Sequence, residues 1–273
     1  MSTPRLKAPG GACDCHMHIY ENRYPLASTA TFKPPHAPVR AYLEVQRRLG
    51  LERMVVVQPS AYGFDNSCTL TAVAALGSRA RGIAVVPPDV SDDELARLAA
   101  AGVKGIRYFM LAGGVVGWDT LERMALRVAP LGWHVQLQVD GRTLPDHESL
   151  LKGLPCALVI EHNGKFLEPV STDHRAFRAL QRLLDGGRCW VKVSAPYETS
   201  VSGPPHYEDV ARIAKALIRT NPERCLWASN WPHPNQTTLP DDALLLDLLL
   251  EWAGSDDARR RMLVDNPAEL YGF

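Results

Sequence analysis

Short apolar segments rich in valine and isoleucine recur along the chain and alternate with segments in which leucine and alanine return at helical spacing. The short segments are typical of buried strands and cover residues 12–20, 53–60, 81–88, 103–109, 134–139, 157–164, 189–195 and 225–231. The segments between them predict helices at about 38–50, 69–78, 92–101, 119–130, 146–152, 174–185, 207–220 and 241–253. Eight strand and helix pairs predict an α/β fold, a (β/α)8 TIM barrel.

The ends of the elements carry further signals. Ser91 stands at the start of the helix at 92–101 as a candidate cap. The tail DNPAELYGF predicts a short closing helix, with Asn266 as its cap and Pro267 at its first helical position. A doubly wound open sheet is the alternative fold, but no glycine-rich dinucleotide fingerprint follows the first strand. No repeat or linker divides the sequence, so we expect residues 1–273 to form a single domain with a flexible N-terminus at 1–10.

Composition narrows the classes of partner. Lysine plus arginine and aspartate plus glutamate both total 30, so the formal net charge is +0 and attraction to nucleic acid or anionic membranes is not expected. The six cysteines form no C-x-x-C pair and are expected to be free thiols. The N-terminus lacks an apolar signal core, and no stretch is long and apolar enough for a membrane helix. We therefore expect a soluble cytoplasmic protein whose partner is a small molecule.

The first strand carries the clearest chemical signal. Asp14, His16 and His18 alternate along it, so their side chains share one face, which must be the barrel interior. Two imidazoles two residues apart can bind a metal ion or polarise a carbonyl group together. The alternative is a pair of core histidines with satisfied hydrogen bonds.

Other strand ends place charged and polar groups where a barrel builds its active site. Arg107 ends an apolar strand, and we expect it to hold a substrate carboxylate in bidentate fashion, the alternative being an ion pair with an acid on a neighbouring strand. Lys192 faces inward and needs either a substrate anion or a structural partner. His162 ends the sixth strand, and we expect its neighbour Glu161 to point the opposite way. Gln138 lies on the inward side of the fifth strand.

Loop residues give weaker signals. Ser60 and Asn66 follow the second strand and Tyr197 follows the seventh, and each of these side chains could contact a substrate or only shape a turn. His134 begins the fifth strand and should lie at the opposite end of the barrel in a structural role. The proline-rich segment 25–38 suits a loop over the barrel mouth or an inert surface excursion.

Six segments together resemble the amidohydrolase superfamily, in the branch that includes 2-pyrone-4,6-dicarboxylate lactonase and D-galactarolactone isomerase. They are GACDCHMHIY, KGIRYF, VIEHNG, VKVSAPYE, LWASNWPHP and NPAELYGF. The similarity runs from about residue 10 to the end of the chain. It implies a barrel that acts on a small cyclic ester, often one that carries a carboxylate.

The resemblance also implies roles for particular residues. His16, His18 and His162 would surround the scissile carbonyl and Arg107 would lie near a substrate carboxylate. Asn230 occupies the position on strand eight where related proteins usually carry an aspartate. Metal-binding members usually have that aspartate together with a lysine, histidine or glutamate on strand four or five. The three histidines could supply ligands for zinc, but the anionic ligand is missing and Arg107 is a cation, so no metal or other cofactor is expected.

Asn230 changes the expected reaction. A carboxamide has no useful basicity, so it cannot take a proton from an attacking water molecule. An internal hydroxyl group needs less help, because effective molarities of well-placed internal nucleophiles reach roughly 10⁵ M. We therefore expect an isomerase that interconverts D-galactaro-1,5-lactone and the 1,4-lactone by intramolecular acyl transfer. Its substrate-binding residues are expected to be Ser60, Asn66, Arg107, Gln138, Lys192, Tyr197 and His233.

Two other functions remain open. A lactone hydrolase would use the same cavity, with His233 or a metal hydroxide as the base. A catalytically inactive barrel that binds a sugar acid would explain the amide as the mark of a lost activity, although three inward histidines argue against it.

Overall fold

Eight parallel strands form one sheet whose spatial order follows the sequence, β1-β2-β3-β4-β5-β6-β7-β8. The computed structural model describes residues 2–273. Its strands are β1 Cys13–Met17, β2 Arg53–Val57, β3 Ala80–Ala84, β4 Val103–Phe109, β5 His134–Gln138, β6 Leu158–Ile160, β7 Cys189–Ser194 and β8 Cys225–Ala228. Two backbone hydrogen bonds just beyond the ends of β1 and β8, from His18 to Trp231 and from Asn230 to His16, join the first strand to the last. The sheet is thus closed, which confirms the predicted barrel.

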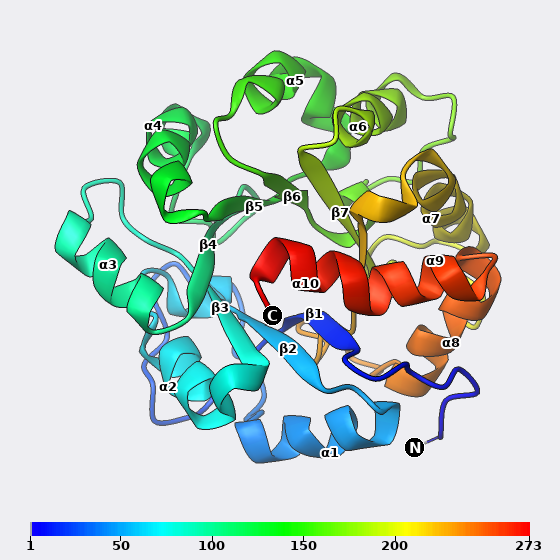
Figure 1. Ribbon diagram of the computed structural model, residues 1–273, viewed down its shortest axis with the longest axis horizontal. Helices are drawn as coiled ribbons and strands as arrows, with labels where there is room; N and C mark the ends of the chain where they lie inside the picture. Colours follow the sequence, from blue (N-terminus) through cyan, green and yellow to red (C-terminus); the bar gives the residue numbers. More distant parts are fainter. Residues whose placement is uncertain (1) are drawn as a thin grey trace.

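A helix follows each strand and packs on the outside of the barrel (Figure 1). These helices are α1 Val39–Leu49, α2 Ser67–Leu76, α3 Asp92–Ala100, α4 Trp118–Val128, α5 Leu144–Gly153, α6 Arg175–Asp185, α7 Glu208–Thr220 and α8 Asp242–Trp252. Leucines, valines and alanines on their inner faces make one large hydrophobic core with the outward side chains of the strands. As predicted, the Ser91 hydroxyl caps α3 by accepting a hydrogen bond from the Glu94 amide.

The strands end earlier than the hydrophobic pattern predicts. β6 stops at Ile160, and the chain then turns sharply through His162, which has a φ of 50°. β8 stops at Ala228, and Asn230 has a φ of 59°. The apolar pattern continues because these segments are buried, although their backbone is no longer extended.

The C-terminal segment closes one end of the barrel. The helix α9 Asp256–Arg260 continues through a π-helical turn at Arg261–Asp265 into α10 Asn266–Tyr271, which lies across the barrel opening (Figure 1). The closing helix is confirmed, but the expected cap is wrong. The Asn266 side chain donates to the carbonyl oxygens of Pro222 and Cys225 and so ties α10 to β8.

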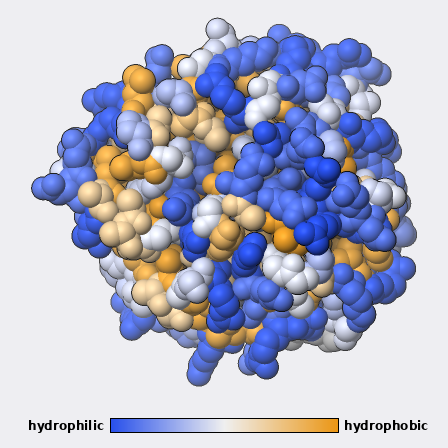
Figure 2. All heavy atoms as spheres, in the orientation of Figure 1, coloured by the Kyte–Doolittle hydropathy of each residue, from blue (hydrophilic) through white to orange (hydrophobic). Residues whose placement is uncertain are grey.

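This end is the amino end of the barrel, where His134 begins β5 and its ring meets that of Tyr271 edge to face. Both ring nitrogens of His134 are buried without a hydrogen-bond partner among the described residues. Its position away from the strand carboxyl ends agrees with the structural role that the sequence predicts. Seen from the same side, the molecular surface is largely hydrophilic (Figure 2).

The N-terminal segment and the cysteines complete the description. Residues expected to be flexible lie against α8, where Leu6 is 5% exposed and its amide donates to Asp247. All six cysteines are free and buried, as predicted. Between residues 2 and 273, no helix has the length and apolar character needed to cross a membrane.

Candidate active site

A cavity of about 320 Å³ opens at the carboxyl ends of the strands. Ser60, in the short turn after β2, and Gln138, at the end of β5, line it as predicted. Thr31 and Phe32 of the proline-rich segment also line it, which confirms that this segment covers the barrel mouth. The other polar groups of the lining are His18, Tyr20, Arg107, His162, Lys165, Glu198, Asn230 and Asn235.

Three histidines form the floor. The ring centroid of His16 lies 4.7 Å from that of His18 and 4.8 Å from that of His162. His18 and His162 line the cavity, whereas His16 is fully buried just beneath them. The predicted cluster is therefore present, built from the end of β1 and the turn after β6.

Hydrogen bonds set the tautomers of two of these rings. His18 Nδ1 lies 2.7 Å from the Val57 carbonyl oxygen and must therefore donate to it. Its Nε2 is then an acceptor, and His16 Nε2, 3.1 Å away, must carry the proton between them. His16 Nδ1 in turn accepts from Lys192 Nζ at 3.2 Å. Each ring thus has one fixed orientation.

Of the three rings, only that of His162 has a nitrogen, Nε2, that is not already in a hydrogen bond with a described residue. Its Nδ1 lies 2.9 Å from the Ser194 hydroxyl, which can donate to it. Its Nε2 lies 3.6 Å from Glu161 Oε2, beyond hydrogen-bonding distance. His162 can therefore present an Nε2–H group to an oxygen atom in the cavity.

All three imidazoles are neutral at neutral pH. Burial, together with the Lys192 ammonium group, lowers the pKa of His16 well below its usual range. Burial lowers the pKa of His18 to about 3 and that of His162 to about 4. These rings can therefore donate hydrogen bonds without bringing a positive charge into the site.

Arg107 is held by Glu161. Its Nε lies 2.9 Å from Glu161 Oε1 and its Nη2 lies 2.8 Å from Glu161 Oε2, and it also donates to the Gln58 carbonyl and to Gln138. Four of the five guanidinium N–H groups are thereby engaged. The expected bidentate grip on a substrate is wrong, because the fork is already filled by an acid of a neighbouring strand.

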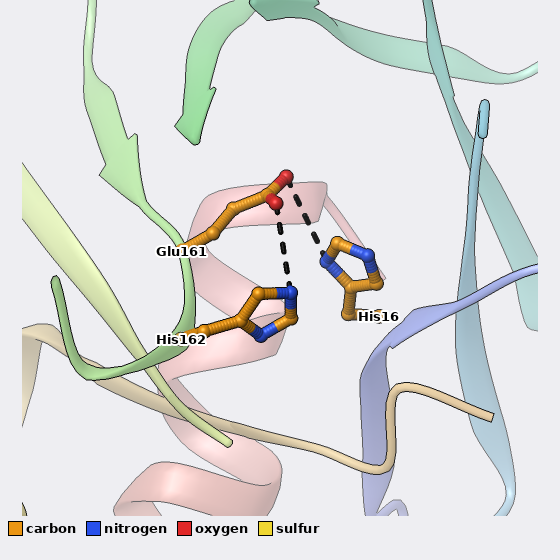
Figure 3. Close-up of side chains that lie close together, drawn as sticks. All are labelled: His16, Glu161 and His162. Atoms are coloured by element: carbon orange, nitrogen blue, oxygen red, sulfur yellow. Dashed lines mark ion pairs between the residues drawn. The ribbon is translucent and has the colours of Figure 1, made fainter. Parts of the chain in front are cut away.

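Glu161 points inward, and the expectation that it faces away from the barrel interior is wrong. β6 ends at Ile160, so the alternation of side chains stops before Glu161. Figure 3 shows its carboxylate between the rings of His16 and His162. Burial raises the pKa of Glu161, but the Arg107 guanidinium together with His162 and Lys192 lowers it more, to about 2.

Lys192 lies beneath the cavity floor and does not line it. Its Nζ donates to Gln136 Oε1 at 2.6 Å as well as to His16, and the residue is fully buried. Burial lowers its pKa to about 8. The expected contact with a substrate anion is therefore wrong; the structural alternative holds, and Lys192 orients His16.

Asn230 ends a chain of hydrogen bonds that runs in one direction. The Asp242 carboxylate accepts from His233 Nε2 at 3.0 Å, so His233 Nδ1 is the acceptor for the Tyr197 hydroxyl at 2.9 Å. The Tyr197 oxygen accepts from Asn230 Nδ2 at 3.0 Å. His233 and Tyr197 lie behind the lining of the cavity, so the expectation that they bind substrate directly is wrong.

The Asn230 amide orientation follows from these contacts. Its Nδ2 also donates to Glu198 Oε1 at 3.2 Å, and its Oδ1 has no partner among the described residues. The residue lines the cavity, but this oxygen is itself buried. An aspartate here would place its carboxylate against that of Glu198, which gives a physical reason for the amide.

Lys165 and Glu198 line the cavity and form an ion pair that sequence reasoning did not identify. Lys165 follows the turn after β6, and Glu198 ends the short turn Pro196–Glu198 after β7. The signal in the sequence was that a charged residue follows each of two adjacent strands, β6 and β7. Tyr20, also missed, lies just beyond β1.

Asn66 does not reach the cavity. Its Nδ2 donates to the Val85 carbonyl at 2.8 Å and its Oδ1 accepts from the Val85 amide at 3.0 Å. The expected substrate contact is wrong, because this side chain joins the loop after β2 to the end of β3.

Left-handed backbone is concentrated at the ends of the last three strands. Positive φ values there include 50° at His162, 48° at Lys165, 47° at Ala195, 59° at Asn230 and 61° at His233. Such conformations cost on the order of 1–3 kcal/mol each and are typical of functional sites. Here they direct side chains into the cavity or toward its wall.

One group of possible metal ligands occurs in the described part of the chain, and it comprises His16, Glu161 and His162. Both Glu161 oxygens already accept from Arg107, and the proton on His16 Nε2 leaves only Nδ1, which accepts from the Lys192 ammonium group. Two cations thus already lie against the atoms that an ion would need as ligands, and they would repel it. This donor set does not fit a divalent metal.

Known proteins resemble the whole chain. A 2-pyrone-4,6-dicarboxylate hydrolase from Comamonas testosteroni is 34% identical over 99% of this chain and 93% of its own. A D-galactarolactone isomerase from Agrobacterium fabrum is 34% identical over 99% and 94%. A 4-sulfomuconolactone hydrolase from Hydrogenophaga intermedia is 32% identical over 98% and 91%.

A solved structure and a family model agree with these relatives. A crystal structure of an Agrobacterium tumefaciens protein without ligand superposes with a TM-score of 0.94, at 34% identity and 99% coverage of both chains. The family model described as amidohydrolase matches residues 13–273. The chain therefore belongs to the amidohydrolase family, as its strand-end motifs suggest.

Proposed function

We propose that this protein is a sugar-acid lactone isomerase that interconverts D-galactaro-1,5-lactone and the 1,4-lactone by intramolecular acyl transfer, without a metal ion. The observation that carries the proposal is Asn230, an amide in the cavity lining at the position where related proteins usually carry an aspartate. A carboxamide cannot take a proton from water, which favours a reaction whose nucleophile belongs to the substrate. The relative named D-galactarolactone isomerase, at 34% identity, supports this choice of substrate.

The histidines would activate the acyl group. His162 Nε2–H is the donor best placed for the carbonyl oxygen, because its other nitrogen is bound to Ser194. Negative charge that develops on that oxygen would be stabilised by this donor. His16 and His18 complete the floor with fixed tautomers. No water molecule has to be activated, since the nucleophile belongs to the substrate.

The free carboxylate of the lactone also has candidate partners. Arg107 lines the cavity and retains one N–H group, and the Ser60 hydroxyl and Gln138 are in the same lining. Their contribution is a single charge-assisted hydrogen bond with two neutral contacts. Arg107 thus orients the substrate less tightly than a bidentate pair would.

The test is to follow the 1,5-lactone of galactaric acid by ¹³C NMR while base uptake is recorded on a pH-stat. We expect a new 1,4-lactone carbonyl signal without acid release, and equal rates with and without a chelator. Acid release with an open-chain product would contradict the proposal. Loss of activity with chelator, restored by zinc, would contradict its metal-free form.

A lactone hydrolase is the second candidate, because the relatives named as hydrolases are 32–34% identical to this chain. The expected base His233 is not available to it, since both ring nitrogens are bound to Tyr197 and Asp242. Asn230→Asp separates the two functions. It would supply a carboxylate at the end of β8, and we expect this variant to release acid from a lactone that the parent only isomerises.

A further inference from the structure

Glu198 is the one carboxylate among the cavity-lining residues of the described chain. It lies in the turn after β7, and its side chain is 12% exposed. One oxygen pairs with the Lys165 ammonium group, and the other accepts from Asn230 Nδ2 at 3.2 Å. The amide that replaces the usual acid of β8 is thus itself in contact with an acid from β7.

The surroundings of Glu198 keep it charged. Burial raises its pKa, but Lys165 and His162 lower it more, so that the net shift is downward. The Glu161 carboxylate acts in the opposite direction and raises the pKa of Glu198. The Tyr197 hydroxyl accepts a hydrogen bond from the same Asn230 amide group. A carboxylate at the wall of a cavity can accept a proton from a hydroxyl group bound there.

We infer that Glu198 is a catalytic residue that carries the proton during acyl transfer, and that Asn230 positions Glu198. This inference rests on the proposed function for the identity of the substrate. It assigns to the end of β7 the carboxylate that is absent from the end of β8.

The proposed step conserves atoms and charge. A Glu198 oxygen takes the proton of the substrate hydroxyl group as that oxygen bonds to the acyl carbon. The resulting tetrahedral oxyanion is held by His162 Nε2–H. When the bond from the acyl carbon to the original ring oxygen breaks, Glu198 returns the proton to that oxygen. The product is the isomeric lactone, and Glu198 is again a carboxylate.

Other ionisable groups near the cavity are already committed. His18 Nε2 accepts from His16, and the two oxygens of Glu161 accept from Arg107. Burial raises the pKa of the Tyr20 hydroxyl far above its usual range, so it stays protonated. Both oxygens of Glu198 also have partners, but Glu198 is the carboxylate that lines the cavity, whereas Glu161 lies beneath it. Its position and its charge therefore suit proton transfer.

The experiment compares the parent with Glu198→Gln, Glu198→Asp and Glu198→Ala on the same lactone. We expect Glu198→Gln to lower kcat by about 10²- to 10⁴-fold with only a small loss in the thermal midpoint, and Glu198→Asp to retain part of the rate. The matched control is Glu122→Gln, on the exposed face of α4, which should keep the parent rate.

Glu198→Ala tests the chemistry itself. Formate and acetate should restore part of its rate, and acetate, the stronger base, should restore more at equal concentration. A Glu198 that served only as the structural partner of Lys165 would give no dependence on the basicity of the added carboxylate. The absence of that dependence, or a Glu198→Gln rate within twofold of the parent, would overturn the inference.

Failure of the proposed function gives a different result. In that case the parent itself releases acid and forms no isomeric lactone. A parent that isomerises together with an unimpaired Glu198→Gln variant removes only the role of Glu198.

Discussion

Two polar networks meet at the cavity, and they are built differently. The inner network consists of Arg107, Glu161, Gln136, Lys192 and His16 and is between 0% and 4% exposed. It lies beneath the floor except at Arg107, which lines the cavity. The rim network lies along one wall and consists of Lys165, Glu198, Asn230, Tyr197, His233 and Asp242. In the inner network both oxygens of Glu161 are satisfied. In the rim network one acceptor, Asn230 Oδ1, is left free.

This difference separates support from chemistry. Breaking a buried ion pair leaves an uncompensated charge in a low-dielectric interior, so the inner network resists change. The rim network ends at a cavity, where Lys165 and Glu198 can meet a substrate. We conclude that the inner network fixes the histidines, whereas the rim network exchanges hydrogen bonds with the substrate.

Acid should have the largest effect. Burial lowers the pKa of His18 and of His134 to about 3, that of His162 to about 4 and that of His16 well below its usual range, so the unfolded chain binds up to four more protons between pH 4 and 6. Burial raises the pKa of Asp14 to about 6, which offsets one of them. Their stabilising contribution is present above pH 6.5 and is lost on acidification, by up to about 4 kcal/mol per pH unit. Urea unfolding at pH 7, 6 and 5 measures it, and equal midpoints would contradict the assignment of neutral histidines.

Glu161→Gln should show the next largest effect. It leaves Arg107 buried without its anion, and we expect the free energy of unfolding to fall by about 3–5 kcal/mol. The matched change in the rim network, Glu198→Gln, should cost much less stability because Lys165 retains access to the cavity. Urea unfolding of both variants at pH 7.5 tests this. Equal losses would remove the distinction between the two networks.

His162→Asn should separate rate from stability. Loss of a preorganised donor to a developing oxyanion lowers kcat by about 10²- to 10³-fold. His174→Asn is the matched control, since His174 caps α6 at the exterior of the barrel. Steady-state kinetics on the lactone provide the measurement. A His162→Asn variant with the parent kcat would move the oxyanion donor to another residue.

Tyr197→Phe should have the smallest effect. It removes the hydroxyl group that joins His233 to Asn230 but leaves the Glu198 contact with the amide intact. We expect kcat to fall about tenfold, which corresponds to about 1.4 kcal/mol. Asp242→Asn, one link further back, should have a smaller effect still. A larger loss for Asp242→Asn than for Tyr197→Phe would show that the chain does not act through Asn230.

The sequence was informative where strand geometry alone decides which way a side chain points. Alternation placed His16, His18 and Lys192 inside the barrel, because a strand repeats its facing every two residues. The same rule failed at Glu161, since β6 had ended one residue earlier and the chain was turning. The alternation rule says nothing about Lys165 and Glu198, because they lie in turns after the strands and their positions depend on left-handed backbone and on a loop.

The sequence by itself determined the barrel, the bounds of its helices to within about two residues, the face of the first strand and the amide at Asn230. Only the tertiary structure decided which charges meet. Arg107 and Glu161 are 54 residues apart, and Lys165 and Glu198 are 33 apart. The physical reason is that parallel strands bring their carboxyl ends to one rim whatever their separation in sequence. The partner of each charge is therefore set by strand order and turn geometry, which local patterns do not encode.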